Sequence, residues 1–150
     1  MDSAVDPNCL ASALRMLQAS DKFESEIRSR LARQGFESGP IESVIAHLIR
    51  RKLLDDRRSI TNLIASKSGR RAVGIEKLRA EMLARGAPEG IVEECLSEVS
   101  PDGQYQAMLA ALSAKFEPHG DRVRGARYLL SRGFHEDQID AALDAFFQMP

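Results

Sequence analysis

Three glycines, Gly35, Gly86 and Gly133, recur 51 and 47 residues apart, and a similar apolar pattern surrounds each of them. One apolar side chain stands four residues before the glycine, and others stand six, nine and ten residues after it. These positions hold Leu31, Ile41, Val44 and Ile45 around the first glycine, Met82, Val92, Cys95 and Leu96 around the second, and Leu129, Ile139, Ala142 and Leu143 around the third. Apolar residues three or four apart share one helix face, and a glycine after a helix commonly takes the left-handed conformation that ends it. The pattern therefore predicts a helix, a glycine corner and a second helix, formed three times.

A further helical stripe precedes each of these pairs, and no segment alternates with period two over a convincing length. We therefore predict an all-α fold: an elongated row of three tandem three-helix repeats, with about nine helices and no sheet. We expect a flexible N-terminus over residues 1–9 and repeats over residues 10–55, 56–100 and 101–150. Repeats this small bury little core alone, so neighbours must pack on one another. The three glycines would be structural corners. An irregular helical bundle with unrelated glycines is the alternative.

Composition favours a protein of the cytoplasm. The net charge is −1, 43% of the residues are hydrophobic and no tryptophan is present. Cys9 and Cys95 lie far apart and form no C-x-x-C spacing, which is typical of reduced thiols. The N-terminus carries acidic residues in place of a signal peptide, and the apolar runs are too short to span a membrane.

Residues that could carry out catalysis are scattered. His47, His119 and His135 have neither a second ligand at helical spacing nor a neighbouring cysteine. The acidic pair Asp55 and Asp56 is explained better by helix capping than by a metal site. We therefore predict no catalytic residue, no metal site, no cofactor and no enzymatic activity.

Basic charge is the remaining functional signal. The densest segment contains Arg57, Arg58, Lys67, Arg70, Arg71, Lys77 and Arg79 against one acid, Glu76. A further basic face would comprise Arg28, Arg30, Arg33, Arg50, Arg51, Lys52, Arg122, Arg124, Arg127 and Arg132. Acids concentrate instead on the helices predicted around Glu93 and Asp140, so one face could meet phosphates and another a basic protein. An ordinary solvated surface is the alternative. No aromatic residues interleave with the arginines, so any direct DNA contact would be weak and to the backbone.

Four segments in order resemble the RecX family, regulatory partners of the RecA recombinase. The opening segment, residues 13–17 and 25–36, is similar to the family's signature, and Leu53–Asp56 resembles its turn after the third helix. Residues 77–86 and 126–134 resemble the middle and closing units. Two departures stand out: Arg58-Ser59-Ile60-Thr61 replaces an aromatic residue and alanine, and Ala87 replaces a larger apolar residue.

The resemblance implies a cytoplasmic, non-catalytic protein that binds RecA and lodges in the groove of RecA–DNA filaments. It would inhibit filament extension and RecA's recombinase, ATPase and coprotease activities, and so modulate DNA repair and the SOS response. Capping, disassembly and groove blocking all remain open as modes of action, and we expect a monomer. The first alternative is an independent DNA-binding regulator resembling a helix-turn-helix protein. The second is a scaffold of helical repeats with no nucleic-acid role.

Overall fold

The chain forms helices throughout the part that the structure, a computed structural model, describes, residues 5–67 and 69–147. These residues contain no strand. The helices are α1 (Pro7–Ala19), α2 (Glu24–Arg33), α3 (Ser38–Arg50), α4 (Asp56–Ser66), the short 3₁₀ helix η1 (Gly69–Arg71), α5 (Ile75–Ala84), α6 (Glu89–Ser97), α7 (Pro101–Lys115), α8 (Arg122–Ser131) and α9 (Glu136–Phe146). The all-α prediction is confirmed.

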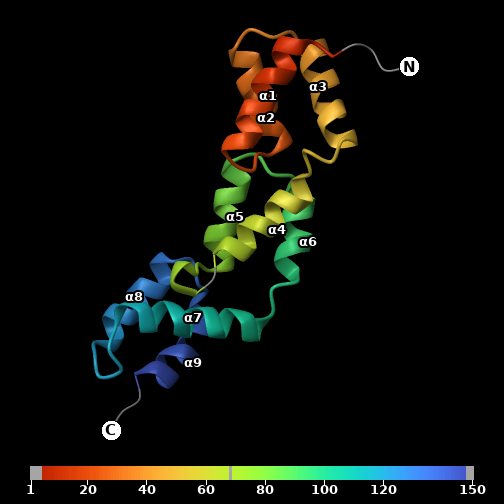
Figure 1. Ribbon diagram of the computed structural model, residues 1–150. Helices are drawn as coiled ribbons and strands as arrows, with labels where there is room; N and C mark the ends of the chain where they lie inside the picture. The colour runs from red at the N-terminus through yellow and green to blue at the C-terminus, as the bar shows by residue number, and fades with distance from the viewer. Residues whose placement is uncertain (1–4, 68, 148–150) are drawn as a thin grey trace.

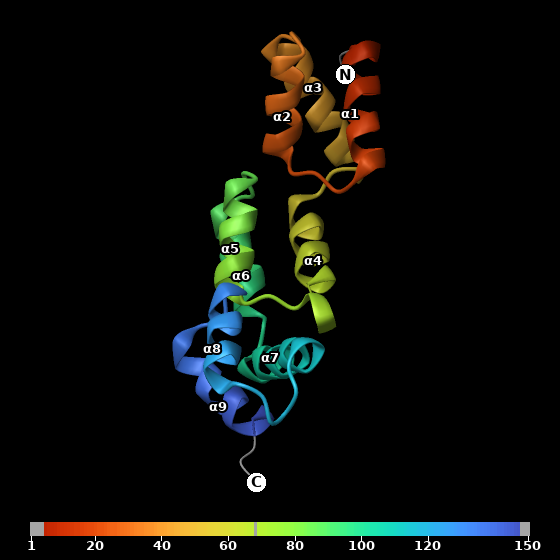
Figure 2. The ribbon, with the colours of Figure 1, turned by 90° about the vertical axis from the view of Figure 1, so that its left-hand side faces the viewer.

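The helices are arranged as an elongated row of three three-helix repeats, α1–α3, α4–α6 and α7–α9, as Figures 1 and 2 show. Each repeat has its own hydrophobic core. The core of the first centres on Ile27, Leu31 and Leu48, and that of the third on Met108 and Leu129, all fully or almost fully buried.

The cores of neighbouring repeats interlock. The segment between α1 and α2 places Phe23 in the core of the second repeat, where the side chain is 1% exposed. The segment between α4 and α5 likewise places Ala72, 0% exposed, in the core of the third repeat. In both places the segment between a repeat's first two helices completes the next repeat's core. Small repeats of this kind are stabilised by packing against their neighbours.

The three glycine corners share one backbone geometry. Gly35, Gly86 and Gly133 have φ of 97°, 85° and 89°. Each glycine N–H donates to a carbonyl three residues earlier at 3.0 Å, and the following N–H donates to a carbonyl five residues earlier at 3.0 to 3.2 Å. This pair of bonds defines the Schellman motif, which satisfies carbonyls at the helix end.

Two of the corners dock on the preceding repeat, so α2, α5 and α8 form a column along the row (Figures 1 and 2). Gly86, just after α5, contacts Ser25 at the start of α2, and Gly133, just after α8, contacts Lys77 at the start of α5. The C-terminal end of one helix therefore meets the N-terminal end of another, which aligns their macrodipoles favourably. No atom lies within 4 Å of a side chain built at Gly35.

The N-terminal segment departs from the expectation of a flexible stretch over residues 1–9. Residues 1–4 lie outside the described part of the chain, but α1 begins at Pro7 and Cys9 is completely buried. The carboxylate of Asp6 accepts the N–H groups of Asn8 and Cys9 at 2.9 and 3.0 Å. The sequence Asp6-Pro7-Asn8 also suits a turn. Here Asp6 caps the helix and Pro7 occupies its first turn, where proline is favoured.

Candidate functional site

Several cations of the predicted middle segment are engaged in ion pairs with the repeat's own acids. Arg79 on α5 binds both carboxylate oxygens of Glu93 on α6, at 2.6 and 3.2 Å, and Glu76 at 2.7 Å. Arg57 on α4 pairs with Glu94 on α6. The acids and bases that lie apart in the sequence therefore meet across the second repeat. The expected separation into an acidic and a basic face does not hold here.

The other cations of this segment differ in how far they are engaged. The Nη1 group of Arg58 donates to the carbonyl oxygen of Lys52 at 2.9 Å. Lys67 is half-buried, Arg71 and Lys77 are exposed, and none of the three forms an ion pair within the described residues. The side chain of Arg70 lies outside the part of the chain that the structure describes. Lys67, Arg71 and Lys77 thus remain available to an external anion.

The further basic face divides in the same way. Arg28 forms a bidentate ion pair with Glu42 at 2.7 and 3.0 Å, and Arg122 pairs with Asp144 at 2.7 Å. Arg132 donates two hydrogen bonds, at 3.1 and 2.8 Å, to the carbonyl oxygen of Ala72. Arg50 is exposed on α3. Six others are exposed and form no ion pair within the described residues: Arg30, Arg33, Arg51, Lys52, Arg124 and Arg127.

The pairs Arg28–Glu42 and Arg79–Glu93 are the same bond formed in two repeats. In each, the arginine stands seven residues before the corner glycine and the glutamate seven after it. The bond joins the two helices on either side of the corner. These arginines therefore hold repeats together internally, a role that the apolar positions alone did not indicate.

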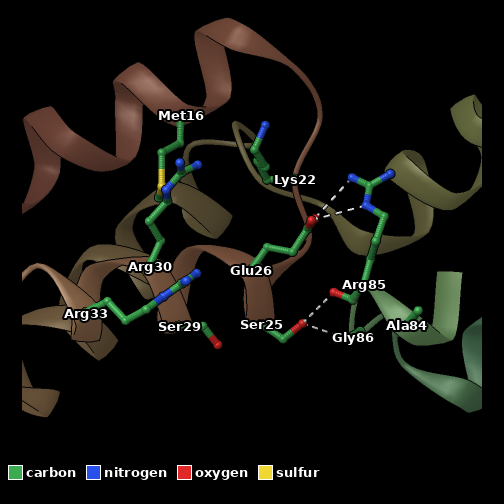
Figure 3. A pocket seen from close by; sticks show the side chains of 10 residues that line it. All are labelled: Met16, Lys22, Ser25, Glu26, Ser29, Arg30, Arg33, Ala84, Arg85 and Gly86. Atoms are coloured by element: carbon green, nitrogen blue, oxygen red, sulfur yellow. Dashed lines mark hydrogen bonds and ion pairs between the residues drawn. The ribbon is translucent and has the colours of Figure 1, made fainter. Parts of the chain in front are cut away.

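A hollow of about 430 Å³ opens between the first and second repeats (Figure 3). Its walls are contributed by the end of α1, by Lys22 from the segment between α1 and α2, by α2, and by the end of α5 with the two residues that follow it. The lining residues are Met16, Lys22, Ser25, Glu26, Ser29, Arg30, Arg33, Ala84, Arg85 and Gly86.

Arg85 is the central link between the first two repeats. Its Nε and Nη2 lie 3.1 Å from the two carboxylate oxygens of Glu26, and Nη2 also donates to the carbonyl oxygen of Asp21 at 3.1 Å. The guanidinium lies over the ring of Phe23, 4.8 Å from its centre. Burial alone would raise the pKa of Glu26, but the hydrogen bonds from Arg85 and from the Phe23 N–H outweigh it and lower that pKa. Glu26 is thus held as a carboxylate.

Sequence reasoning did not identify Lys22 or Arg85 as site residues. The available signal for Arg85 was its position directly before Gly86, which Arg132 repeats before Gly133. Both arginines bind backbone carbonyls of the preceding repeat.

Asp56 forms a second link between the first two repeats. Its Oδ1 accepts the N–H of Glu24, the first residue of α2, at 2.9 Å, and the residue is 8% exposed. Burial raises the pKa of Asp56, although the hydrogen bond from Glu24 acts in the opposite direction. Burial also raises the pKa of the Glu24 carboxyl, and the charge of Asp56 adds to that rise. Asp55, by contrast, caps α4 through the N–H of Arg58.

Within residues 5–67 and 69–147, no group of three or more histidine, cysteine, aspartate or glutamate side chains is placed to hold a metal ion. None of the helices there combines the length and apolar character that a membrane span needs.

Comparison with known proteins gives consistent matches over nearly the whole chain. A family model described as "RecX, first three-helix domain" matches residues 9–48. The protein named "Regulatory protein RecX" from Prosthecochloris aestuarii is 34% identical over 90% of this chain and 91% of its own length. Its namesake from Thermus thermophilus is 34% identical over 91% of this chain and 89% of its own.

Solved structures agree on the fold. The crystal structure of RecX from Lactobacillus salivarius superposes with a TM-score of 0.80, covering 95% of this chain and 96% of that one, at 18% sequence identity. A second crystal structure, of a regulatory protein RecX, gives a TM-score of 0.74 over 91% of this chain and 72% of that one, at 17% identity.

Proposed function

Because the chain belongs to the RecX family of regulatory proteins, we propose that it binds RecA and lodges in the groove of RecA–DNA filaments. By occupying the groove it would limit filament extension and lower RecA's recombinase, ATPase and coprotease activities, and so modulate DNA repair and the SOS response. It would act in the cytoplasm, without catalysis of its own and as a monomer.

The observation that carries this proposal is the elongated row with exposed cations on every repeat. A helical groove presents protein walls and nearby DNA phosphates over a long path, which an extended row can follow. Arg33 in the first repeat, Arg71 in the second and Arg127 in the third are exposed and have no ion-pair partner among the described residues. Such cations bind phosphate by releasing counterions, independently of base sequence.

Among the cations of the middle segment, we propose Lys67, Arg71 and Lys77 as the first contacts with the filament. Arg57 and Arg79 are held by acids of the same repeat, and they could contact an external anion only by leaving those partners. Their main role is to fix α4 and α5 against α6.

The test is RecA's ATPase activity on single-stranded DNA, with this protein added below and at stoichiometry. We expect dose-dependent inhibition. Inhibition far below stoichiometry would indicate capping of filament ends, whereas proportional inhibition would indicate groove occupancy. An unchanged rate at stoichiometric protein would overturn the proposal.

The contact assignment is tested in the same assay with Arg71→Glu. Arg15→Glu is the matched control, because Arg15 is also exposed, has no ion-pair partner among the residues that the structure describes, and belongs to neither basic set. Arg71→Glu should shift the inhibition curve to higher protein concentration more than Arg15→Glu does, with unchanged helicity by circular dichroism. Equal curves for the two variants would remove Arg71 from the contact surface.

A further inference from the structure

We propose that the hollow between the first and second repeats binds a phosphate group of a nucleic-acid backbone, held by Arg30 and Arg33. The inference rests on the proposed function, in that the filament would bring DNA phosphates to the protein. It adds a defined binding site, where the sequence indicated only a broad basic face.

The hollow has an excess of positive charge. Its lining includes four cations and one carboxylate, Glu26, so its net charge is +3. Glu26 is already engaged by Arg85 and by the Phe23 N–H at 2.9 Å. Arg30 and Arg33 have no ion-pair partner within the described residues, so their charge is available to a ligand. A recess in which one sign of charge predominates focuses the field and attracts counter-ions.

The chemistry of these groups favours phosphate. Arg30 and Arg33 are three residues apart on α2, so their side chains leave the same side of the helix. A guanidinium presents a planar set of donors that matches two oxygens of a phosphate, and two guanidiniums can share one phosphate. Figure 3 shows both arginines along α2 on one side of the hollow and the Glu26–Arg85 pair on the other. A chain of phosphodiesters could enter this open recess with one phosphate between the arginines.

The site belongs to the first junction alone. Counting from the corner glycine, the residues of the second repeat that correspond to Arg30 and Arg33 are Glu81 and Ala84. The second junction, between α5 and α8, therefore lacks the two free cations.

The experiment measures binding of the full chain to a fluorescently labelled single-stranded oligonucleotide by anisotropy, over a range of salt concentrations. The test variant is the double change Arg30→Gln and Arg33→Gln. The control is the double change Arg15→Gln and Lys115→Gln, which removes the same charge from two exposed residues outside both basic sets.

We expect the test variant to bind at least tenfold more weakly than the control at low salt. We also expect its slope of log K against log salt to be shallower by about 1, as one lost phosphate contact predicts. Equal affinities and slopes for the two variants would overturn the proposal. Arg30→Lys with Arg33→Lys should restore most of the salt slope but only part of the affinity.

Titrations with inorganic phosphate and with acetate at equal ionic strength distinguish phosphate from carboxylate binding. Phosphate should shift the amide resonances of Ser29 and Gly86 in the unaltered protein but not in the test variant. Equal shifts with acetate would show a carboxylate site and overturn the phosphate assignment. RecA ATPase inhibition separates the two proposals: normal inhibition with DNA binding equal to the control would defeat this site while leaving the proposed function intact.

Discussion

The backbone of Gly74 lies directly against that of Gly133. A side-chain carbon built on Gly74 would come within 2.1 Å of the Gly133 carbonyl oxygen, and the Gly74 N–H donates to the carbonyl oxygen of Arg132 at 2.7 Å. The second and third repeats are therefore joined through their main chains. Glycine at position 74 is required for space, because its φ of −77° is accessible to any residue.

Gly74→Ala should destabilise the protein by about 1–3 kcal/mol, the usual cost of overpacking a closely packed site. Gly90→Ala is the control: nothing lies within 4 Å of a side chain built at that helical glycine, and alanine favours helix by about 1 kcal/mol. Urea unfolding should therefore give opposite signs for the two changes in free energy. A neutral Gly74→Ala would mean that the main chains of these repeats can separate at little cost.

The Arg85–Glu26 pair should contribute measurably to stability. The two side chains are 32% and 25% exposed, and removing either leaves a half-buried charge without its partner. Arg85→Met and Glu26→Gln should each lower the free energy of unfolding by about 1.5 kcal/mol, as expected for hydrogen bonds to charged groups. Because both changes break one interaction, the double variant should lose less than the sum of the two, measured by a double-mutant cycle in urea. Additive losses would show that the pair contributes no coupling energy, and Arg15→Gln serves as the exposed control.

The pH dependence of stability should carry a signature of Asp56. Its pKa is raised by burial, so between the unfolded and the folded pKa the folded protein binds more protons than the unfolded chain. The free energy of unfolding contributed by this group therefore falls as the pH rises through that window, and is highest below it. Asp56→Asn should remove this fall, because an amide does not titrate in this range. Its oxygen can still accept the Glu24 N–H, so the hydrogen bond itself is kept.

Comparing urea unfolding of Asp56→Asn and the unaltered protein at several pH values checks this expectation. The difference in their free energies should change with pH only within the titration window of Asp56. Asp121→Asn is the matched control, because Asp121 is exposed and caps α8 through the N–H groups of Val123 and Arg124. A constant difference across the pH range would contradict a raised pKa at Asp56.

The fold was predictable because its main signals are local. The apolar helix faces around Gly35 and Gly133 are set by residues within about ten positions of each glycine. The structure contains these helices, and the glycines that end them have positive φ. The start of the first helix was missed because Asp6-Pro7-Asn8 suits a turn as well as a helix cap. Local residues alone do not decide between these two.

The site was less predictable because its contacts join distant residues. Arg85 and Glu26 are 59 positions apart, and Asp56 and Glu24 are 32 apart. No spacing rule connects such residues before the repeats are placed against one another. The same limit applies to Arg57. The sequence does not show that α6 places Glu94 next to its guanidinium, where the two form an ion pair. The availability of a surface arginine is therefore a property of the packed row.

The placement of Phe23 in the core of the second repeat has a consequence for synthesis on the ribosome. The N-terminal repeat leaves the exit tunnel first, and its three helices can pack while Phe23 still faces water. The pocket for that ring forms only when Ile60, Leu78 and Met82 have also emerged. Ala72 likewise becomes buried only when the third repeat has emerged and formed its core. Each newly made repeat thus covers the apolar residue left open by the one before it, so folding can follow the direction of translation.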